Sequence, residues 1–151
     1  MTLSVEARAF VALQRAANRL QLELAQLLRQ HDLSPSQYNA LRILRGAGPD
    51  GLPCNLIGAR LLTHDPDITR LLDRMEQRGW IARSRDTTDR RRINARLTGA
   101  GDQLVRSLDR IVQRHHKETL GSLGERRLRG LTAALESWLA DDASISRDND
   151  N

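Results

Sequence analysis

The chain has 151 residues, 39% of them apolar, which fits a globular protein of one domain or two very small ones and excludes a disordered chain. Its net charge is +5, and the basic excess is +4 in residues 51–100, against +2 before and −1 after that segment. A single cysteine, Cys54, excludes an internal disulfide, and no stretch approaches the ~20 apolar residues of a membrane span. The first residues also lack the basic start and apolar run of a signal peptide, so we expect a cytoplasmic protein with no membrane partner.

The first predicted helix covers residues 4–29, where leucine and alanine recur at helical spacing. Its apolar stripe is wide, which indicates a partner helix in addition to the chain's own core. A second helix is predicted to begin with Ser34 as its N-cap and Pro35 in the first helical position, and Gln37 completes a capping box. Its inward-facing residues are predicted to be Tyr38, Leu41 and Leu44.

Two shorter helices are predicted to follow. The third begins near Pro53. Its buried residues are expected to be Ile57 and Leu61. The fourth has Asp65 as its expected cap and Pro66 as its first residue, and Gly79 terminates it. The face opposite its apolar stripe carries Thr69, Arg70, Asp73, Arg74 and Arg78.

A basic stretch, residues 85–94, holds four arginines, two aspartates and two threonines. It lies between two short runs in which apolar and polar residues alternate, residues 80–85 and 92–97. Two such runs around a polar, turn-prone link predict an antiparallel β-hairpin with the basic stretch at its tip. Because an anionic partner relieves the repulsion among these arginines, the tip is expected to contact phosphate.

The last third of the chain is again helical in pattern. One helix is predicted from Thr98 to about Leu120, and another follows the break "GSLGE". Residues 141–151 have almost no apolar content and are predicted to be a disordered acidic tail. Two short helices joined by a tight turn and followed by a basic hairpin are the layout of a winged helix-turn-helix. We therefore expect a mainly α fold with a small β-hairpin wing, whose recognition helix enters the major groove of double-stranded DNA.

Four motifs then occur in a fixed order. They are T-R-L-x-D-R-x-E in residues 69–76, glycine and two apolar residues entering the first hairpin strand, D-x-x-D-R-R in residues 86–91, and L-T-x-x-G in residues 97–101. Together with "LSPSQYNALRIL" in the second helix, they make the chain resemble the multiple antibiotic resistance regulator (MarR) family over roughly residues 10–140. The combination in this order is specific, whereas no single motif is.

The resemblance implies a homodimer that binds a pseudo-palindromic operator, usually as a ligand-responsive repressor. In this interpretation, residues 1–32 and 99–140 form an intertwined helical dimerisation region, and residues 33–98 form the winged helix-turn-helix domain. Relatives often bind small, usually aromatic, anionic effectors between these two regions, and such an effector is the expected small-molecule partner.

Carried over residue by residue, the resemblance implies contacts to DNA from Thr69, Arg70 and Arg74 of the recognition helix. Arg91 is expected to enter the minor groove, with Asp89 orienting it through an ion pair. Three other wing arginines are assigned to DNA, namely Arg85, Arg90 and Arg92. Of these, Arg90 and Arg92 are expected to contact phosphates.

The sequence departs from the family at the start of the recognition helix, which normally carries small hydroxyl or basic residues. Here it reads Asp65-Pro66-Asp67. Asp67 either stabilises the helix dipole or accepts a hydrogen bond from a cytosine amino group of the DNA. We favour the dipole interpretation, because it assumes nothing about the DNA sequence.

Other residues have simpler interpretations beside the functional ones. The arginines of the fourth helix are spaced to pair with Asp73 and Glu76, and for Arg78 this interpretation is preferred. The neighbouring histidines His115 and His116 point about 100° apart on a helix, so they do not converge on one metal ion.

Cys54, at a helix start, would react with oxidants if its pKa were lowered, but a small half-buried residue is the preferred interpretation. Tyr38, Arg42 and Arg15 are candidates to line an effector pocket, although ordinary packing and surface positions are preferred for them. The sequence lacks a Gly-rich phosphate loop, a nucleophile elbow and metal-ligand spacing, so we expect neither enzyme activity nor a cofactor. Two alternatives stay open: a nonspecific architectural DNA-binding protein, and a winged helix that binds RNA or a protein.

Overall fold

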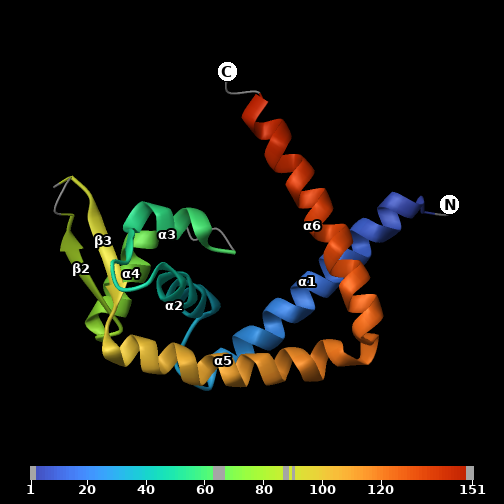
Figure 1. The fold of residues 1–151 in the computed structure, drawn as a ribbon. Coiled ribbons are helices and arrows are strands. Elements are labelled where there is room, and N and C mark those ends of the chain that lie inside the picture. Colours follow the sequence, from blue (N-terminus) through green and yellow to red (C-terminus); the bar gives the residue numbers. More distant parts are fainter. Residues whose placement is uncertain (1–2, 63–66, 87–88, 90, 149–151) are drawn as a thin grey trace. The chain divides into compact units, whose positions relative to one another are not determined.

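The computed structural model describes residues 3–62, 67–86, 89 and 91–148, and for residues 141–148 it describes the backbone only (Figure 1). Within these residues the chain is mainly helical with one small antiparallel sheet, as the sequence predicts. It divides into two compact units, residues 1–110 and residues 111–151. None of the helices in this part of the chain combines the length and the apolar character that a membrane span requires.

The first unit contains the helices α2 (Pro35–Ala47), α3 (Cys54–Arg60) and α4 (Ile68–Gln77). The start of α2 confirms the predicted capping box. The Ser34 hydroxyl accepts the N–H of Gln37 at 3.2 Å, and the Gln37 side chain accepts the N–H of Ser34 at 2.9 Å. These bonds satisfy two backbone donors that a helix start otherwise leaves without partners. Gly48 follows the helix with φ at +78°, a left-handed conformation that glycine adopts without steric cost.

The recognition helix α4 starts later than predicted. It begins at Ile68, and its N-cap is Asp67 rather than Asp65. The Asp67 carboxylate accepts the N–H of Arg70 at 2.9 Å, which is the bond that defines a cap. Asp65 and Pro66 lie outside the described residues. Either aspartate has the side chain of a good N-cap, so local pattern alone did not rank them.

The wing is a three-stranded antiparallel sheet in the order β1-β3-β2. Its strands are β1 (Leu52–Pro53), β2 (Ile81–Arg85) and β3 (Ile93–Leu97). The predicted hairpin is confirmed, with pairs running from Ile81–Leu97 to Arg85–Ile93, and it lies beside α4 (Figure 1). The strand β1 was not predicted, because two residues ending in proline carry too little pattern. The third helix is correspondingly short, and Leu61, predicted to be buried in it, is only half-buried beyond its end.

The core of the first unit is aliphatic and receives side chains from the end of α1 (Val5–Arg29), from α2, α3, α4 and the sheet, and from the first half of α5 (Gly99–Leu120). The predicted inward-facing residues of α2 are all buried. The largest fully buried side chains are Leu28, Leu41, Leu44, Ile57, Leu72, Met75, Ile81, Val105 and Leu108. Burial of each such side chain contributes roughly 1.5–3 kcal/mol, so this core fixes the position of the recognition helix.

The start of α5 is joined to the end of α4 by two residues of the L-T-x-x-G motif. The Thr98 hydroxyl donates to the carbonyl of Gly79 at 2.6 Å and accepts the N–H of Gly101 at 3.1 Å. A Cβ atom on Gly101 would lie 2.0 Å from the carbonyl oxygen of Trp80. No other residue type fits at that separation, so the geometry accounts for both the threonine and the glycine.

Two long helices expose most of their apolar residues. In α1 (Val5–Arg29), whose N-cap is Ser4, Leu28 is the only buried residue. In the second unit, the short helix η1 (Gly121–Leu123) takes the place of the predicted break and α6 (Glu125–Asp148) follows it. None of the side chains described in α6 is buried.

For residues 141–148 the structure differs from the predicted disordered tail, because α6 continues to Asp148. Residues 149–151 lie outside the described residues. A polar composition predicts that a segment does not pack into a core, but extending an existing helix costs far less than starting one. Composition alone therefore did not exclude a helix here.

Candidate nucleic-acid interface

The exposed face of α4 carries the residues that the sequence assigned to DNA recognition. Thr69, Arg70 and Arg74 are exposed, whereas Leu71 and Leu72 are buried, as an amphipathic helix requires. Among the described residues neither arginine has an ion-pair partner, so both guanidinium groups are available to an anion. They flank a groove of about 310 Å³ whose other wall is the start of α2.

Asp67 lies on the same exposed surface, where its carboxylate caps α4. A negative charge at this end also interacts favourably with the helix dipole. The bond to the Arg70 N–H supports the dipole interpretation over recognition of cytosine, since one carboxylate oxygen is already engaged.

The tip of the wing is organised by two carboxylates. Asp86 accepts the N–H of Asp89 at 3.1 Å and the side-chain amide of Asn94 at 2.8 Å. Asp89 accepts the N–H of Arg91 at 3.0 Å through its carboxylate and the N–H of Arg92 at 2.9 Å through its carbonyl. These bonds fix the backbone from which the wing arginines project.

The predicted ion pair between Asp89 and Arg91 is wrong. The carboxylate of Asp89 lies 3.4 Å from the guanidinium of Arg92, and its bond to Arg91 runs through the backbone. The side chain of Arg91 is exposed and has no ion-pair partner among the described residues, and the same holds for Arg85. Arg90 lies outside them. Asp89 therefore orients the backbone of Arg91 and pairs with a different arginine.

Arg83, on β2, was not singled out from the sequence, yet it makes the densest set of polar contacts near α4. Its Nε donates to Glu76 at 2.9 Å, its Nη2 donates to Glu76 at 2.7 Å and to Asp73 at 2.5 Å, and its backbone N–H donates to Glu76 at 2.9 Å. These bonds hold the pKa of Glu76 below its usual value. The interpretation that Asp73 and Glu76 pair with arginines of their own helix is therefore wrong.

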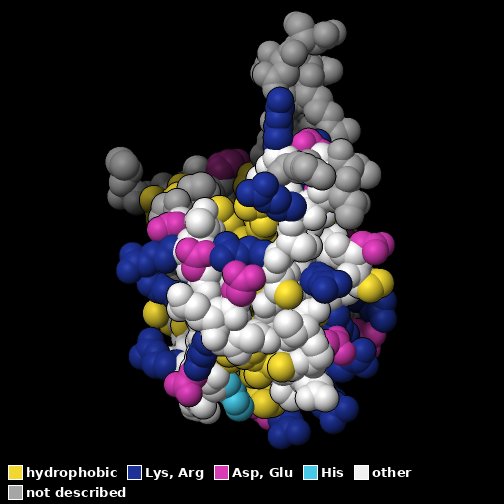
Figure 2. All heavy atoms as spheres, turned by 90° about the vertical axis from the view of Figure 1, so that its left-hand side faces the viewer, with side chains coloured by type: hydrophobic (Ala, Val, Ile, Leu, Met, Phe, Trp, Pro, Cys, Tyr) yellow, Lys and Arg dark blue, Asp and Glu magenta, His cyan; other side chains and the backbone are white. Residues whose placement is uncertain are grey.

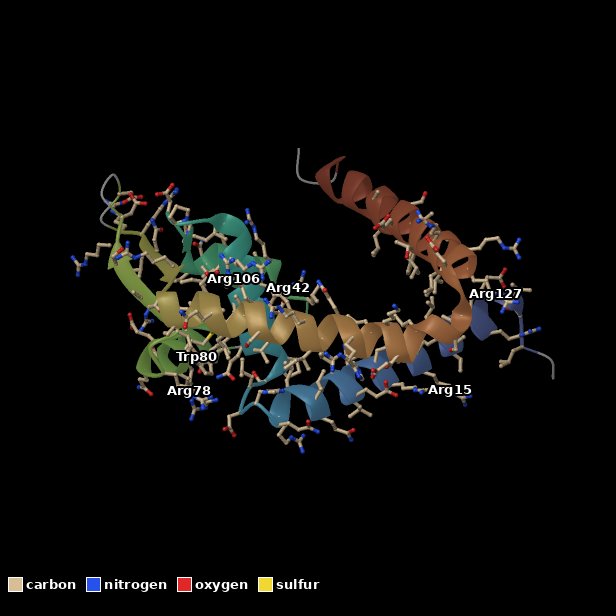
Figure 3. All side chains as sticks on the ribbon, turned by 60° about the horizontal axis from the view of Figure 1, so that its bottom comes forward. Arg15, Arg42, Arg78, Trp80, Arg106 and Arg127 are labelled. Atoms are coloured by element: carbon tan, nitrogen blue, oxygen red, sulfur yellow. The ribbon has the colours of Figure 1, made fainter. Side chains whose placement is uncertain are left out.

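Arg78, near the end of α4, has a structural role, but it contacts other residues than the predicted carboxylates of its own helix. Its guanidinium carbon lies 4.4 Å from the centroid of the Trp80 ring, and Nη1 donates to the carbonyl of Asp32 at 2.5 Å (Figure 3). The stacking and the hydrogen bond tie the end of α4 to the loop before α2. This arrangement agrees with the preference for a structural interpretation of Arg78, although its partners are not the ones that the helical spacing suggested.

Cys54 is half-buried at the start of α3, in agreement with the preferred interpretation. Burial raises the pKa of its thiol, which disfavours the reactive thiolate. The residue lines a groove of about 440 Å³ together with Arg91 and Arg92 of the wing.

Tyr38 and Arg42 belong to a polar cluster between α2 and α5. The Tyr38 hydroxyl donates to one carboxylate oxygen of Asp109 at 2.7 Å, and Arg45 donates to the other. The Nε atom of Arg42 lies 3.7 Å from the same oxygen that Tyr38 contacts. Burial, followed by the bond to Asp109, raises the pKa of Tyr38. Arg15 lies on α1, at a distance from Arg42 on α2 (Figure 3). The structure thus does not bring the three candidate pocket residues together.

The side of the molecule that presents the hairpin carries many arginine side chains, with acidic side chains among them (Figure 2). Within the described residues, no three His, Cys, Asp or Glu side chains are placed to hold a metal ion. His115 and His116 have ring centroids 6.0 Å apart. The exposed arginines of this surface that have no ion-pair partner among the described residues suit it to contact with an anionic polymer.

A helix-turn-helix that exposes two arginines on its last helix, followed by a sheet with an ordered basic tip, defines a winged helix-turn-helix DNA-binding protein. The model of the MarR family matches residues 33–93. The chain belongs to this family of helix-turn-helix transcriptional regulators.

Three comparisons illustrate the relationship. The chain is 35% identical to a MarR transcription factor from Planctomyces limnophilus, covering 90% of this chain and 98% of that one with a TM-score of 0.70. It is 25% identical to MepR of S. aureus in a structure bound to DNA. That match covers 93% of this chain and 99% of the MepR chain, with a TM-score of 0.76. It is 32% identical over 87 residues to the uncharacterized HTH-type regulator YkoM of Bacillus subtilis, covering 58% of this chain and 53% of YkoM. The chain thus spans about half the length of that relative.

Proposed function

We propose that this protein is a repressor that binds a pseudo-palindromic operator as a homodimer in the cytoplasm. Each α4 enters a major groove, where Thr69, Arg70 and Arg74 contact bases and phosphates, and each wing brings Arg91 to the adjacent minor groove. The observation that carries the proposal is the pairing pattern of the arginines: Arg70, Arg74 and Arg91 are exposed without ion-pair partners among the described residues. Repression is the action named for one relative, the transcriptional repressor MdtR of Bacillus subtilis, 32% identical over 61% of this chain.

The homodimer is supported by the apolar surface that a single chain leaves in water. In α1, Val5 is 76% exposed and Phe10 63%, and in α6, Trp138 is 59% exposed and Leu139 60%. Helices with this much exposed apolar surface need a partner to bury it. We infer that residues 1–32 and 99–140 supply that contact in a second copy, and that residues 33–98 bind the DNA.

We also propose that a small aromatic or anionic effector controls DNA binding. A groove of about 510 Å³ between α1 and the start of α2 is lined partly by apolar residues, among them Leu22, Ala25 and Pro35, and is large enough for a small aromatic molecule. The polar groups in its lining are those of Asn18, Gln21 and Ser36.

The test of operator binding is a mobility-shift assay with genomic fragments from around the protein's own gene, with excess competitor DNA and a salt series. A discrete complex that survives competition, with a steep dependence on salt, is the expected result. Complexes that all competitors remove equally would favour the architectural alternative. The absence of any complex would favour the protein-binding or RNA-binding alternative.

A further inference from the structure

The recognition helix has no net positive charge of its own. Between Asp67 and Arg78 the sequence holds three arginines and three carboxylates, so its formal charge is zero. Two of the carboxylates, Asp73 and Glu76, are partly exposed, with side-chain exposures of 45% and 37%. Beside a duplex, these two negative charges oppose the attraction of Arg70 and Arg74 to phosphate.

Arg83 is placed to cancel that opposition. Its guanidinium bonds to both carboxylates, through Nη2 to Asp73 at 2.5 Å and through Nη2 and Nε to Glu76 at 2.7 and 2.9 Å. Charge-assisted bonds of this multidentate kind fix orientation as well as charge. The backbone N–H of Arg83 adds a fourth bond, to Glu76 at 2.9 Å, so the strand β2 itself is attached to α4.

Arg83 is not itself well placed to bind DNA. It is opposite Ala95 in the sheet, and that residue is fully buried, so Arg83 lies on the face of the hairpin that packs against the helices. Its side chain is 23% exposed, and Nε and Nη2 are already engaged. Arg96 lies on β3 opposite Ala82, on the other face of the same sheet, and is exposed.

We propose that Arg83 is a positioning residue for DNA binding, which neutralises Asp73 and Glu76 on the recognition helix and fixes the angle between that helix and the wing. The inference rests on the proposed placement of α4 and the wing on DNA. Its consequence is that the recognition helix acquires its positive potential from a residue on the neighbouring strand. One arginine thereby controls both the charge and the orientation of the two DNA-binding elements.

The experiment uses duplexes recovered from a random-sequence DNA pool by selection with the wild-type protein, and a scrambled duplex for comparison. Four variants are measured: Arg83→Met, Arg83→Lys, Arg83→Met with Glu76→Gln, and Arg96→Met. The last removes the same charge from the opposite face of the sheet and serves as the matched control. Affinity, the salt dependence of affinity and the thermal unfolding midpoint are recorded for each folded protein.

We expect Arg83→Met to weaken binding to the selected duplex by about tenfold at an unchanged salt slope, and by more than Arg96→Met does. Adding Glu76→Gln should restore part of the loss, because it removes a carboxylate that the first change left uncovered. Arg83→Lys should also restore part, since it returns the charge without the planar fork.

Two results would overturn the inference. A salt slope lowered by about one with no restoration by Glu76→Gln would make Arg83 a direct phosphate contact. If Arg83→Met binds DNA with the affinity of the wild type but has a lowered thermal unfolding midpoint, Arg83 only stabilises the fold. If the wild-type protein selects no sequence from the pool, the proposed operator binding fails, and this outcome is distinct from both.

Discussion

Arg91 is the wing residue whose removal should affect DNA binding most directly. Its side chain is exposed without an ion-pair partner among the described residues, while its N–H is held by Asp89. We expect Arg91→Ala to weaken operator binding by ~1–3 kcal/mol. The slope of log affinity against log salt concentration should fall by roughly one, because the bound complex loses one positive charge beside the DNA. Fluorescence anisotropy of a labelled operator across a salt series measures both quantities.

The control for this change is Arg106→Ala on α5, whose exposed guanidinium is paired with Asp102 at 2.8 Å and which belongs to neither of the elements proposed to contact DNA. It should leave the affinity within about threefold of wild type, because an exposed ion pair outside the proposed DNA contacts contributes little. Unchanged affinity in a folded Arg91→Ala protein would remove the wing tip from the mechanism.

Gly101 is the residue at which a single methyl group should matter most for stability. Because Gly101 has no Cβ atom, there is room for the carbonyl of Trp80, whose oxygen would lie 2.0 Å from a Cβ at this position. We expect Gly101→Ala to destabilise the fold by about 2 kcal/mol or more, since backbone atoms of two elements must separate. Denaturant unfolding followed by circular dichroism checks this.

The matched change is Gly99→Ala, two residues earlier in α5, where a Cβ meets nothing within 4 Å. It should be neutral or slightly stabilising, because alanine favours a helix more than glycine does. Equal effects of the two substitutions would show that helix propensity, and not the contact with Trp80, governs this position.

At the scale of elements, the junction between α2 and α5 depends on the only tyrosine of the chain. Burial and the bond to Asp109 raise the pKa of Tyr38 above its usual value of 10.0. The neutral hydroxyl therefore stabilises the fold fully below pH 10.0, and this contribution is lost as the pH rises through the higher value of the folded state. We expect tyrosinate absorbance to appear only together with unfolding in an alkaline titration.

A reversible tyrosinate titration centred at the usual pKa of 10.0 in the folded protein would contradict that placement of Tyr38. The companion variant, Tyr38→Phe, should lose about 1–2 kcal/mol of unfolding free energy at neutral pH, the contribution of a hydrogen bond to a charged acceptor. The difference between the two proteins should shrink above pH 10.0.

Elements set by local chemistry could be predicted from the sequence. The capping box of Ser34 and Gln37 and the hairpin around the basic stretch depend on residues a few positions apart, and both are confirmed. The two-residue strand β1 depends on a partner more than forty positions away along the chain and has no pattern of its own. The helical backbone of residues 141–148 was missed because composition reports on packing and not on helix continuation.

The same division holds for the candidate site. Exposure of Arg70 and Arg74 follows from helical periodicity and was predictable. The ion-pair partner of Asp89 was not predictable, because Arg91 and Arg92 are both within a few positions of it and only the turn geometry selects Arg92. Arg83 was missed since its carboxylate partners lie on another element, across the turn at Gly79.

At the scale of the whole molecule, the exposed apolar residues of α1 and α6 predict that the monomer does not persist. We expect light scattering after size-exclusion chromatography to give twice the mass of one chain, and a dimer net charge of +10. Phe10→Glu combined with Trp138→Glu should give a monomer with weakened operator binding, because two charges would enter the apolar interface and two linked half-sites would be lost.

The control is Asn18→Asp, which adds a negative charge to α1 without removing apolar surface, and which should stay dimeric. A wild-type protein that elutes as a monomer at micromolar concentration would contradict the proposed assembly. A double variant that remains dimeric would place the interface elsewhere on the chain.

The strand order of the wing also limits what neighbouring molecules can do to one another on DNA. One outer strand, β1, is two residues long and ends in Pro53, which has no N–H to donate to a further strand. The other outer strand, β2, ends in Arg85, whose exposed side chain has no ion-pair partner among the described residues, so two copies of this strand would repel each other there. Neither outer strand of the wing therefore favours pairing with the wing of a second molecule bound beside it on DNA.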